Sequence, residues 1–465
     1  MDKGEGSSLE LKNRFPYASL GGLFVTEGRC CSSIYPYYIT LRTTMSNSPH
    51  HYLSLSVYPL SSNTIETLKS LADVSVFGKG DKNKASKVTA ANRYDCLVRL
   101  LSSLIALTKL SSEVGLYRSM KTSAFSGSEV SYRVFKFVSG YLIDEGYLIR
   151  VEGEWSEGMA STFYITEKLV KWCRDNEIVP RDFGLVNLVR AKYPSHYNDK
   201  GKKEQGKPVD NISTSGDYQD QVRIVSNINH YLSKHTLSTP FVGLFRSFSN
   251  YQDGKKKLTD GGRLYAEGGS YQSLNSEQRL TLTIDGEAVA EVDIKASHLT
   301  LMCFVARTLD NSLPELDPDE DPYHIEDIPR PVVKQWIVAF SSKLKPLTRW
   351  SKEATEKLIE QGVDVVDYKV KEVGEAVANK YPFIHTLPST AVNWGYLQRR
   401  EADALIATMR RLANEYDVPS YPVHDSLIVK QSDILLVTRV MKESFSSIIG
   451  FTPALKVTTS DEVVI

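Results

Sequence analysis

Hydrophobic and polar positions follow three different patterns along the chain. Within residues 1–86, segments such as His51–Tyr58 alternate apolar and polar residues like half-buried strands, and no chemical motif stands out. From about Ala91, leucines recur every three or four residues, which predicts an amphipathic helix. From about Asn227 to the end, strand-like and helix-like stretches alternate around unusual polar residues. Together these patterns predict a mixed α+β protein.

The middle of the chain predicts a small DNA-binding module. A second helix is expected to start near Ser126 or Ser128 and to end at Gly146, and two strands should follow at 147–151 and 162–165. Two helices and a two-stranded wing are the order of a winged helix, which we place at residues 87–182. The residues on its second helix that could reach DNA are Ser131, Arg133 and Lys136. A helical packing or dimerisation module is an equally weighted alternative.

A polar stretch from 193 to 216 predicts a linker, which we place within residues 183–226. It contains a run, Gly201–Lys207, that matches the first seven positions of a phosphate-binding P-loop. Pro208 then stands where that motif needs a Ser or Thr for magnesium, and no apolar strand precedes the run. We therefore exclude a nucleotide site in this segment.

The composition narrows the class of protein. The chain has 465 residues, 41% hydrophobic and 24% charged, which is typical of a soluble protein of about three domains. It has no apolar run long enough for a membrane span and no secretory signal, so we expect a cytoplasmic protein without a membrane partner. Five scattered cysteines argue against a disulfide scaffold or a cysteine zinc site. Basic and acidic residues number 56 each, so DNA contacts would depend on local basic patches.

The first candidate for chemistry is the segment Ala288–Met302. Apolar residues at every second position predict a strand with one apolar face, and Glu291 and Asp293 fall on the opposite face. The pattern then becomes helical from about His298. A carboxylate at the end of a strand, just before a helix, is well placed to hold a metal ion.

The second candidate is the segment Tyr421–Val429. Two apolar runs flank His424, Asp425 and Ser426, which predicts a buried hairpin with an acid at its tip. Burying an aspartate is costly unless a cation or hydrogen bonds compensate for its charge. The alternative is an aspartate that closes an ordinary turn.

The third candidate is a predicted helix on which Arg330 and Lys334 lie one turn apart on a single face. Asp327 is expected to cap this helix, and Pro331 suits its first turn. Two stacked cations could clamp the phosphates of a nucleotide. A solvated basic face is the alternative.

In this order, the three candidates resemble the palm and fingers of family A DNA polymerases and of their relatives, the phage-type single-subunit RNA polymerases. Two further motifs add to the resemblance: Gln398 followed five positions later by Asp403, and the segment Asp260–Ala266. The resemblance covers about Arg246 to Val464. It implies a right-hand polymerase-like palm and fingers core over residues 227–465.

The resemblance also implies roles for individual residues. Asp293 and Asp425 would hold two Mg²⁺ ions, with Mn²⁺ as the alternative, and Lys334 would stabilise charge on the triphosphate. Other residues implied to bind substrate are Arg330, His298, Gln398, Arg263, Tyr265 and His424. Arg263 and Tyr265 would contact the template or primer backbone. The partners would then be a DNA template, a primer and nucleoside triphosphates.

The chain departs from the family at several positions. His298 stands where the DNA polymerases have a Glu that blocks the ribose 2′-hydroxyl and the RNA polymerases have a Gly. A bulky imidazole favours exclusion of ribonucleotides, while a hydrogen bond to the 2′-hydroxyl and a purely structural histidine are the alternatives. Ser426, next to the hairpin acid, matches the RNA polymerases. Val338 replaces an aromatic residue of the fingers helix, so base stacking would use Trp336 or Phe340.

The sequence therefore predicts a compact family-A-like DNA polymerase. As a template-directed nucleotidyltransferase it would add dNTPs to a 3′-hydroxyl, in the replication of a mobile element such as a phage or plasmid. No segment resembles an editing exonuclease. The alternatives are an RNA polymerase or primase on the same scaffold, and a non-catalytic DNA-binding replication protein with a degenerate palm.

Overall fold

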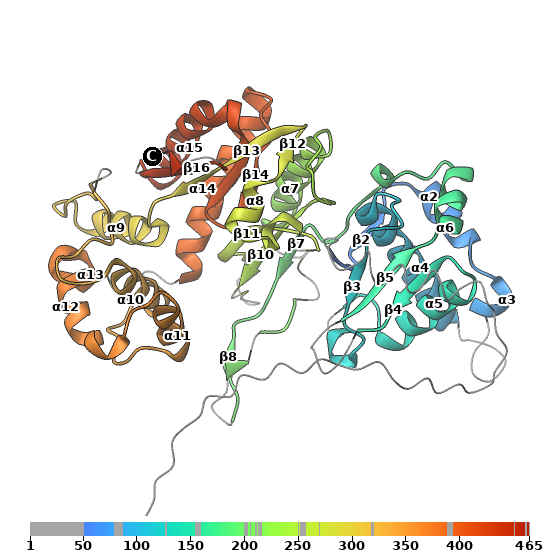
Figure 1. Ribbon diagram of the computed structural model, residues 1–465, viewed down its shortest axis with the longest axis horizontal. Coiled ribbons are helices and arrows are strands. Elements are labelled where there is room, and N and C mark those ends of the chain that lie inside the picture. The colour runs from blue at the N-terminus through green and yellow to red at the C-terminus, as the bar shows by residue number, and fades with distance from the viewer. Residues whose placement is uncertain are drawn as a thin grey trace, which may run out of the picture. The chain divides into compact units, whose positions relative to one another are not determined.

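The computed structural model describes residues 51–464 apart from 79–86, 126–127, 154–159, 200–202, 205, 210–211, 213–215, 250, 252–256, 269, 318–319, 388–393, 451 and 461–462. Expectations for residues 1–50, and for 201, 202 and 205 of the P-loop-like run, lie outside the described residues. Helices and strands both build the protein (Figure 1), so the predicted mixed α+β class is confirmed. Within the described part, no helix is long and apolar enough to cross a membrane.

The N-terminal elements surround the leucine-rich helix. They are β1 (His51–Tyr52), β2 (Val57–Pro59), α2 (Ser62–Ser70), α3 (Val74–Phe77), α4 (Lys87–Thr108), β3 (Leu116–Arg118), α5 (Tyr132–Asp144), β4 (Leu148–Val151), β5 (Ser161–Ile165) and α6 (Glu167–Asp175). Strands β3, β5 and β4 form an antiparallel sheet, and β1 pairs with β3 in parallel. Leu97, Leu100 and Leu104 of α4 are completely buried in the core of this part. The two helices and the hairpin follow the expected chain order, with β3 added between the helices.

Helix α5 begins later than the sequence predicts. Ser131 is its N-cap, with extended backbone angles, and its hydroxyl accepts a hydrogen bond from the amide of Val134. The hydroxyl of Ser128 accepts instead from the amide of Val130, two residues on. Ser128 therefore closes a local turn ahead of the helix rather than capping it.

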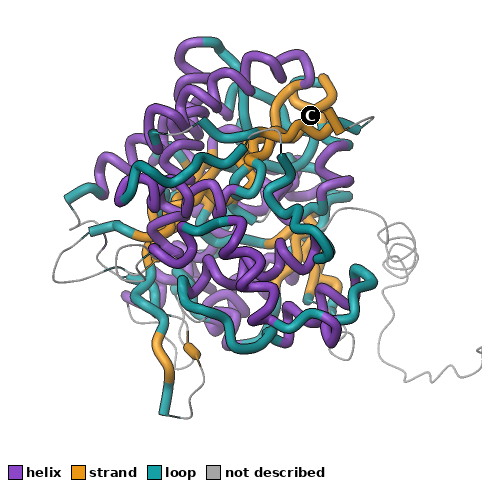
Figure 2. The backbone as a smooth tube through the Cα atoms, turned by 90° about the vertical axis from the view of Figure 1, so that its left-hand side faces the viewer, coloured by secondary structure: helices purple, strands orange, loops and turns teal. Residues whose placement is uncertain are grey.

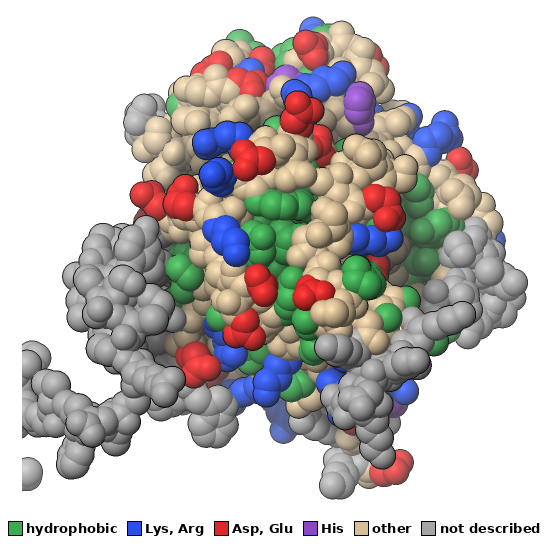
Figure 3. All heavy atoms as spheres, turned by 90° about the vertical axis from the view of Figure 1, so that its right-hand side faces the viewer, with side chains coloured by type: hydrophobic (Ala, Val, Ile, Leu, Met, Phe, Trp, Pro, Cys, Tyr) green, Lys and Arg blue, Asp and Glu red, His purple; other side chains and the backbone are tan. Residues whose placement is uncertain are grey.

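Charges of both signs are mixed on the face that carries these N-terminal elements. Figure 3 shows Lys and Arg side chains lying among Asp and Glu side chains, around a patch of hydrophobic side chains. Arg133 and Lys136 of α5 are both exposed. DNA contacts by this part would therefore depend on individual cations such as these two.

The segment 183–226, predicted as a linker, contains ordered strands. They are β6 (Phe183–Leu185), β7 (Val189–Ala191), β8 (His196–Tyr197) and β9 (Lys203–Glu204). β6 pairs with β2, and β7 pairs in parallel with β10 (Leu244–Ser249). α7 (Tyr218–Leu232) then begins inside the same segment. The chain between the two predicted domains is thus partly built into the sheets on either side.

The C-terminal part combines a twisted sheet with two groups of helices. Its further elements are β11 (Asp260–Ala266), α8 (Ser276–Leu280), β12 (Thr283–Ile284), β13 (Glu287–Ile294), α9 (Ser297–Leu309), α10 (Arg330–Lys343), α11 (Lys352–Glu360), α12 (Val370–Lys380), α13 (Phe383–Thr386), α14 (Trp394–Glu415), β14 (Tyr421–Val423), β15 (Ser426–Lys430), α15 (Ile434–Ile449), β16 (Leu455–Thr458) and β17 (Val463–Val464). The sheet has the strand order β14-β15-β13-β16-β17, and β12 pairs with β13. All of these pairings are antiparallel.

The central strand β13 is buried on both faces. Val289, Ala290 and Val292 are completely buried, and Glu291 is 9% exposed. Helices α14 and α15 pack on each other and on the strands, while α10 packs on α9, α11 and α12 (Figure 1). Figure 2 shows the strands lying among helices. The one-sided apolar strand predicted from the sequence is therefore a central strand with helices and strands around it.

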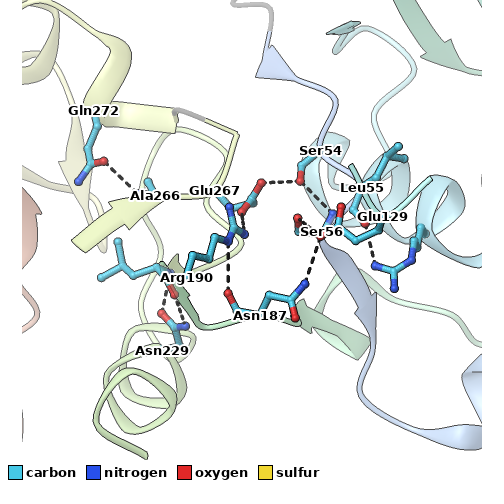
Figure 4. A network of polar contacts seen from close by, with 12 residues as sticks. Ser54, Leu55, Ser56, Glu129, Asn187, Arg190, Asn229, Ala266, Glu267 and Gln272 are labelled. Atoms are coloured by element: carbon cyan, nitrogen blue, oxygen red, sulfur yellow. Dashed lines mark hydrogen bonds and ion pairs between the residues drawn. The ribbon is translucent and has the colours of Figure 1, made fainter. Parts of the chain in front are cut away.

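A polar junction joins the two hydrophobic cores (Figure 4). The buried carboxylate of Glu267, just after β11, accepts a 2.5 Å hydrogen bond from Ser54 and forms an ion pair with Arg190 of β7. Ser56 and Asn187 both donate to the carboxylate of Glu129, at 3.2 Å each. These contacts connect the segment before β2 with the strand β11 of the C-terminal part.

Candidate active site

The two aspartates singled out from the sequence are brought together by the sheet. β13 and β15 are antiparallel, and Asp293 is the register partner of Ser426. Val423 pairs with the same Ser426 from β14, so His424 and Asp425 form the two-residue loop of a tight hairpin. His424 adopts a left-handed backbone conformation, with φ at 54°, which such a turn requires. Asp425 therefore lies beside Asp293 at the end of the central strand.

The local electrostatics disfavour two negative charges at this point. Burial raises the pKa of Asp293 to about 7, and the nearby charges of Asp425 and Glu291 add to the rise. Burial also raises the pKa of Asp425, followed by the charge of Glu401, while Arg263 opposes the shift. Two partly buried carboxylates with too little positive charge around them form a site that a divalent cation would stabilise.

The donor set suits a magnesium site that is completed by substrate and water. Among the described residues, no group of three or more His, Cys, Asp or Glu side chains is arranged to hold a metal ion. Mg²⁺ prefers oxygen ligands and is commonly bound through one or two carboxylates together with waters and substrate phosphates. Asp293 and Asp425 supply two such carboxylates, so the residues present fit this ion.

A third carboxylate, Glu401 of α14, was not predicted. It is completely buried, and its Oε1 accepts hydrogen bonds from Nε and Nη2 of Arg263, at 2.8 and 2.6 Å. Its Oε2 accepts a 2.5 Å hydrogen bond from the hydroxyl of Ser297, the first residue of α9. A signal was present in the sequence, because Glu401 falls on the apolar stripe of α14 between Leu397 and Leu405. Arg263, expected to contact template or primer, is thus engaged in an internal ion pair.

Two histidines flank the carboxylates. The ring of His298 stacks on that of Trp394, with centroids 4.0 Å apart and planes 18° apart. Burial, followed by the charge of Arg263, lowers the pKa of His298 to about 4, and its buried Nε2 has no hydrogen-bond partner among the described residues. Burial and Arg263 also lower the pKa of His424, although this side chain is exposed. Both imidazoles are therefore neutral at pH 7.

Tyr265, which the resemblance implies to contact the template or primer, packs on another aromatic side chain. Tyr265 on β11 stacks on Phe245, with ring centroids 5.8 Å apart. The hydroxyl of Ser426 donates a 2.7 Å hydrogen bond to Glu291, which also forms a paired contact with Arg279. This network fastens β15 to β13 beside the two aspartates, on the same face of the sheet as Asp293.

The motif formed by Gln398 and Asp403 on α14 contacts a buried arginine, Arg246. Asp403 forms ion pairs with Arg399 and with Arg246, a residue that is 1% exposed. Arg246 also donates to Gln221 and to the carbonyl of Gly262. Gln398 is partly exposed on the same helix. Asp403 thus neutralises a buried cation beneath β11.

The basic face of α10 is present, with Arg330 and Lys334 both exposed. Arg330 pairs with Asp321 at 2.6 Å, whereas Lys334 has no partner among the described residues. Asp327 does not cap α10: it has a φ of 62°, and Pro329 occupies the N-cap position. Pro331, in the first turn, has no amide hydrogen, so one of the donors that a capping side chain would otherwise satisfy is absent.

Tyr323 lies in the loop before α10, and its ring contacts Arg330, the first residue of that helix. Tyr323 is 8% exposed, and burial raises its pKa to about 12. The guanidinium of Arg330 lies over its ring, 5.1 Å from the centroid, and lowers this pKa, while the charges of Asp425 and Asp293 raise it. His324 is exposed.

The two aromatic residues expected to stack on a base lie in the core instead. Trp336 and Phe340 are each 3% exposed and stack on each other, with ring centroids 5.2 Å apart. The indole nitrogen of Trp336 donates to the carbonyl of Val370 on α12. These side chains hold α10 to its neighbouring helices, so the prediction that one of them stacks on a base is wrong.

Comparison with known proteins finds distant likeness among solved structures only. No protein-family model and no curated protein matches the chain. Among solved structures, it is similar to the POL domain of Pol1 from M. smegmatis in complex with DNA primer-template and dNTP, at a TM-score of 0.27 and 10% identity. The match covers 91% of this chain and 68% of that one.

Proposed function

We propose that this protein is a template-directed nucleotidyltransferase, a compact DNA polymerase that adds dNTPs to a 3′-hydroxyl. The observation that carries the proposal is the meeting of Asp293 and Asp425 at the end of β13. Two acids from distant parts of the chain and a cationic helix face are the groups that nucleotidyl transfer needs.

Each group has a distinct task in this reaction. Asp293 and Asp425 would hold the divalent ions, which when bound supply a lower pKa for the attacking hydroxyl and charge neutralisation on the pyrophosphate. Lys334 stabilises negative charge that develops on the triphosphate, because its ammonium group is exposed and unpaired among the described residues. Arg330 positions the triphosphate after exchanging its contact with Asp321 for phosphate oxygens.

His298 determines which sugar is accepted. Its ring is held by Trp394 and is neutral at pH 7, so it presents a fixed bulk and one unsatisfied nitrogen. A fixed imidazole at this point excludes a ribose 2′-hydroxyl, which favours dNTPs. A chain that instead used Nε2 to hydrogen-bond that hydroxyl would accept NTPs, as an RNA polymerase or primase would.

The N-terminal part binds the duplex in this proposal. The order α4, β3, α5 and the β4–β5 hairpin is that of a winged helix, with α5 as the helix for the major groove. Arg133 and Lys136 would contact phosphates, while Ser131 is occupied as the N-cap of α5.

Primer extension tests the proposal. A labelled primer on a DNA template is incubated with Mg²⁺ and either dNTPs or NTPs, using the whole chain. We expect extension with dNTPs, loss of extension in Asp425→Asn, and retention in Asp220→Asn, which removes an exposed carboxylate of α7. Extension with NTPs alone would identify the RNA polymerase alternative. DNA binding without any extension would reject the enzymatic proposal in favour of a non-catalytic DNA-binding protein.

A further inference from the structure

The guanidinium of Arg263 stands close to the proposed metal carboxylates. β11, which carries it, packs against β14, the strand that leads into the His424–Asp425 turn. Its partner Glu401 also binds Ser297, four residues after Asp293, which brings the guanidinium near the end of β13 where Asp293 and Asp425 meet. Arginine binds carboxylates through two parallel hydrogen bonds, so a free Arg263 would be a strong competitor for Asp425. Such a pairing would occupy the oxygens that a divalent cation needs.

In the structure this guanidinium pairs with Glu401 instead of Asp425. One of its oxygens accepts from both Nε and Nη2 of Arg263, and the other accepts from Ser297. Glu401 is completely buried and Arg263 is 12% exposed, so the pair is shielded from water and its attraction is strong. Because Ser297 fixes the second oxygen, the carboxylate cannot rotate to follow Arg263 toward Asp425.

We propose that Glu401 is a positioning residue that keeps Arg263 from pairing with Asp425 and so leaves Asp425 available to a divalent cation. This inference rests on the proposed function, because it assumes that Asp425 binds a metal ion. Glu401 does not itself touch the ion or the substrate. Its hydrogen bond with Ser297 also fixes the first turn of α9, which begins four residues after Asp293. One buried side chain therefore positions both Arg263 and the start of α9.

The proposal predicts opposite changes in metal affinity for the Glu401→Gln variant and for the double variant that also changes Arg263. In Glu401→Gln the neutral amide no longer holds the guanidinium, and Arg263 turns to Asp425. In the double variant Arg263→Gln with Glu401→Gln, both the competitor and the residue that restrains it are gone. Metal affinity should therefore fall in the single variant and recover in the double variant.

Mn²⁺ binding measures this without any need for activity. The free Mn²⁺ in titrations of the whole protein, followed by its electron paramagnetic resonance signal, gives the affinity. We expect Glu401→Gln to bind Mn²⁺ about tenfold or more weakly than the unmodified protein, because an uncompensated cation lies beside the ligand. The Mn²⁺ affinity of the double variant should lie within about twofold of that of the unmodified protein, because both charges of the pair are removed. Glu443→Gln, which breaks an exposed pair with Arg411, is the matched control and should leave the affinity unchanged.

The outcomes separate this inference from the proposed function. Unchanged affinity in Glu401→Gln, or a double variant that binds no better than Glu401→Gln, overturns the positioning role alone. Unchanged affinity in Asp425→Asn overturns the metal site and with it both proposals. Should Glu401→Gln fail to fold, the charge-neutral double variant still decides, since weak Mn²⁺ binding by that folded protein contradicts the proposal.

Discussion

Asp293 on β13 and Ser426 on β15 are register partners, and this single pairing places Asp425 next to Asp293. A slip of one residue in the register would send the side chains of β15 to the opposite face of the sheet. The hydrogen bond from Ser426 to Glu291 and the paired contact of Glu291 with Arg279 fasten the register. The candidate site therefore depends on these contacts, which lie on the same face of the sheet as Asp293, as much as on the acids themselves.

The raised pKa of Asp293 predicts a dependence of stability on pH. Burial, Asp425 and Glu291 raise this pKa to about 7 in the folded protein, whereas an unfolded chain ionises near pH 4. Between these values the folded state keeps a proton that the unfolded state has released, so stability falls as the pH rises from about 4 to about 7. Thermal melts across this range should show a smaller decline for Asp293→Asn than for the unmodified protein. An equal decline in both would contradict the assignment.

The exposed cation of α10 predicts a kinetic effect. Because Lys334 meets charge that develops on the triphosphate, Lys334→Ala should lower kcat of primer extension by about a hundredfold. Arg330→Ala should act mainly on KM for the nucleotide, since Arg330 positions the triphosphate. Single-turnover extension separates the two effects. Lys357→Ala, on the exposed side of α11, is the control, and a comparable loss in that variant would remove any special role for Lys334.

Local sequence patterns were sufficient to predict the strand, the hairpin and the helix that carry the candidate acids and cations. Alternation over a few residues indicates a strand, and the polar triplet between apolar runs indicates a tight hairpin. The spacing of Arg330 and Lys334 places them on one helical face wherever that helix lies. Each of these properties belongs to a short segment, so no knowledge of the rest of the fold is needed.

The features that the sequence did not reveal depend on partners far along the chain. Glu401 resembles an ordinary helix residue until Arg263 and Ser297 are known to meet it. Trp336 and Phe340 resemble residues that could stack on a base, because only the position of α12 shows that they are buried. Likewise, the inward direction of Tyr323 depends on how its loop packs.

The two exposed cations of α5 predict salt-dependent DNA binding. Arg133→Ala and Lys136→Ala should each weaken binding to duplex DNA by a few-fold. Each should also reduce the slope of log affinity against log salt concentration by the amount that corresponds to about one phosphate contact. Fluorescence anisotropy with a labelled duplex at several salt concentrations measures both quantities. Lys171→Ala, exposed on α6, is the matched control. If the control and the two α5 variants behave alike, the helix does not form the DNA-binding face.

The pair of Arg246 and Asp403 predicts a large effect on stability. The side chain of Arg246 is 2% exposed, and Asp403→Asn would leave its charge buried without its main partner. Breaking a buried ion pair from one side costs about 3 kcal/mol or more in the free energy of unfolding. Denaturant unfolding measures the loss, and Asp220→Asn, in an exposed pair with Arg223, should change it little. A loss equal to that of the control would show that Asp403 is not needed to hold Arg246.

The contacts of Glu267 predict how much the junction between the N-terminal segment and β11 contributes to the free energy of unfolding. Its buried carboxylate accepts a hydrogen bond from Ser54 and pairs with Arg190, whose guanidinium also lies over the ring of Phe245 at 3.5 Å. Glu267→Gln keeps an acceptor for Ser54 but loses the charge that holds Arg190, so we expect a loss of about 2 kcal/mol in the free energy of unfolding. Ser54→Ala removes only the hydroxyl and should cost about 1 kcal/mol. Denaturant unfolding of both variants measures this order, and a larger loss in Ser54→Ala would mean that the hydroxyl, rather than the ion pair, holds the junction.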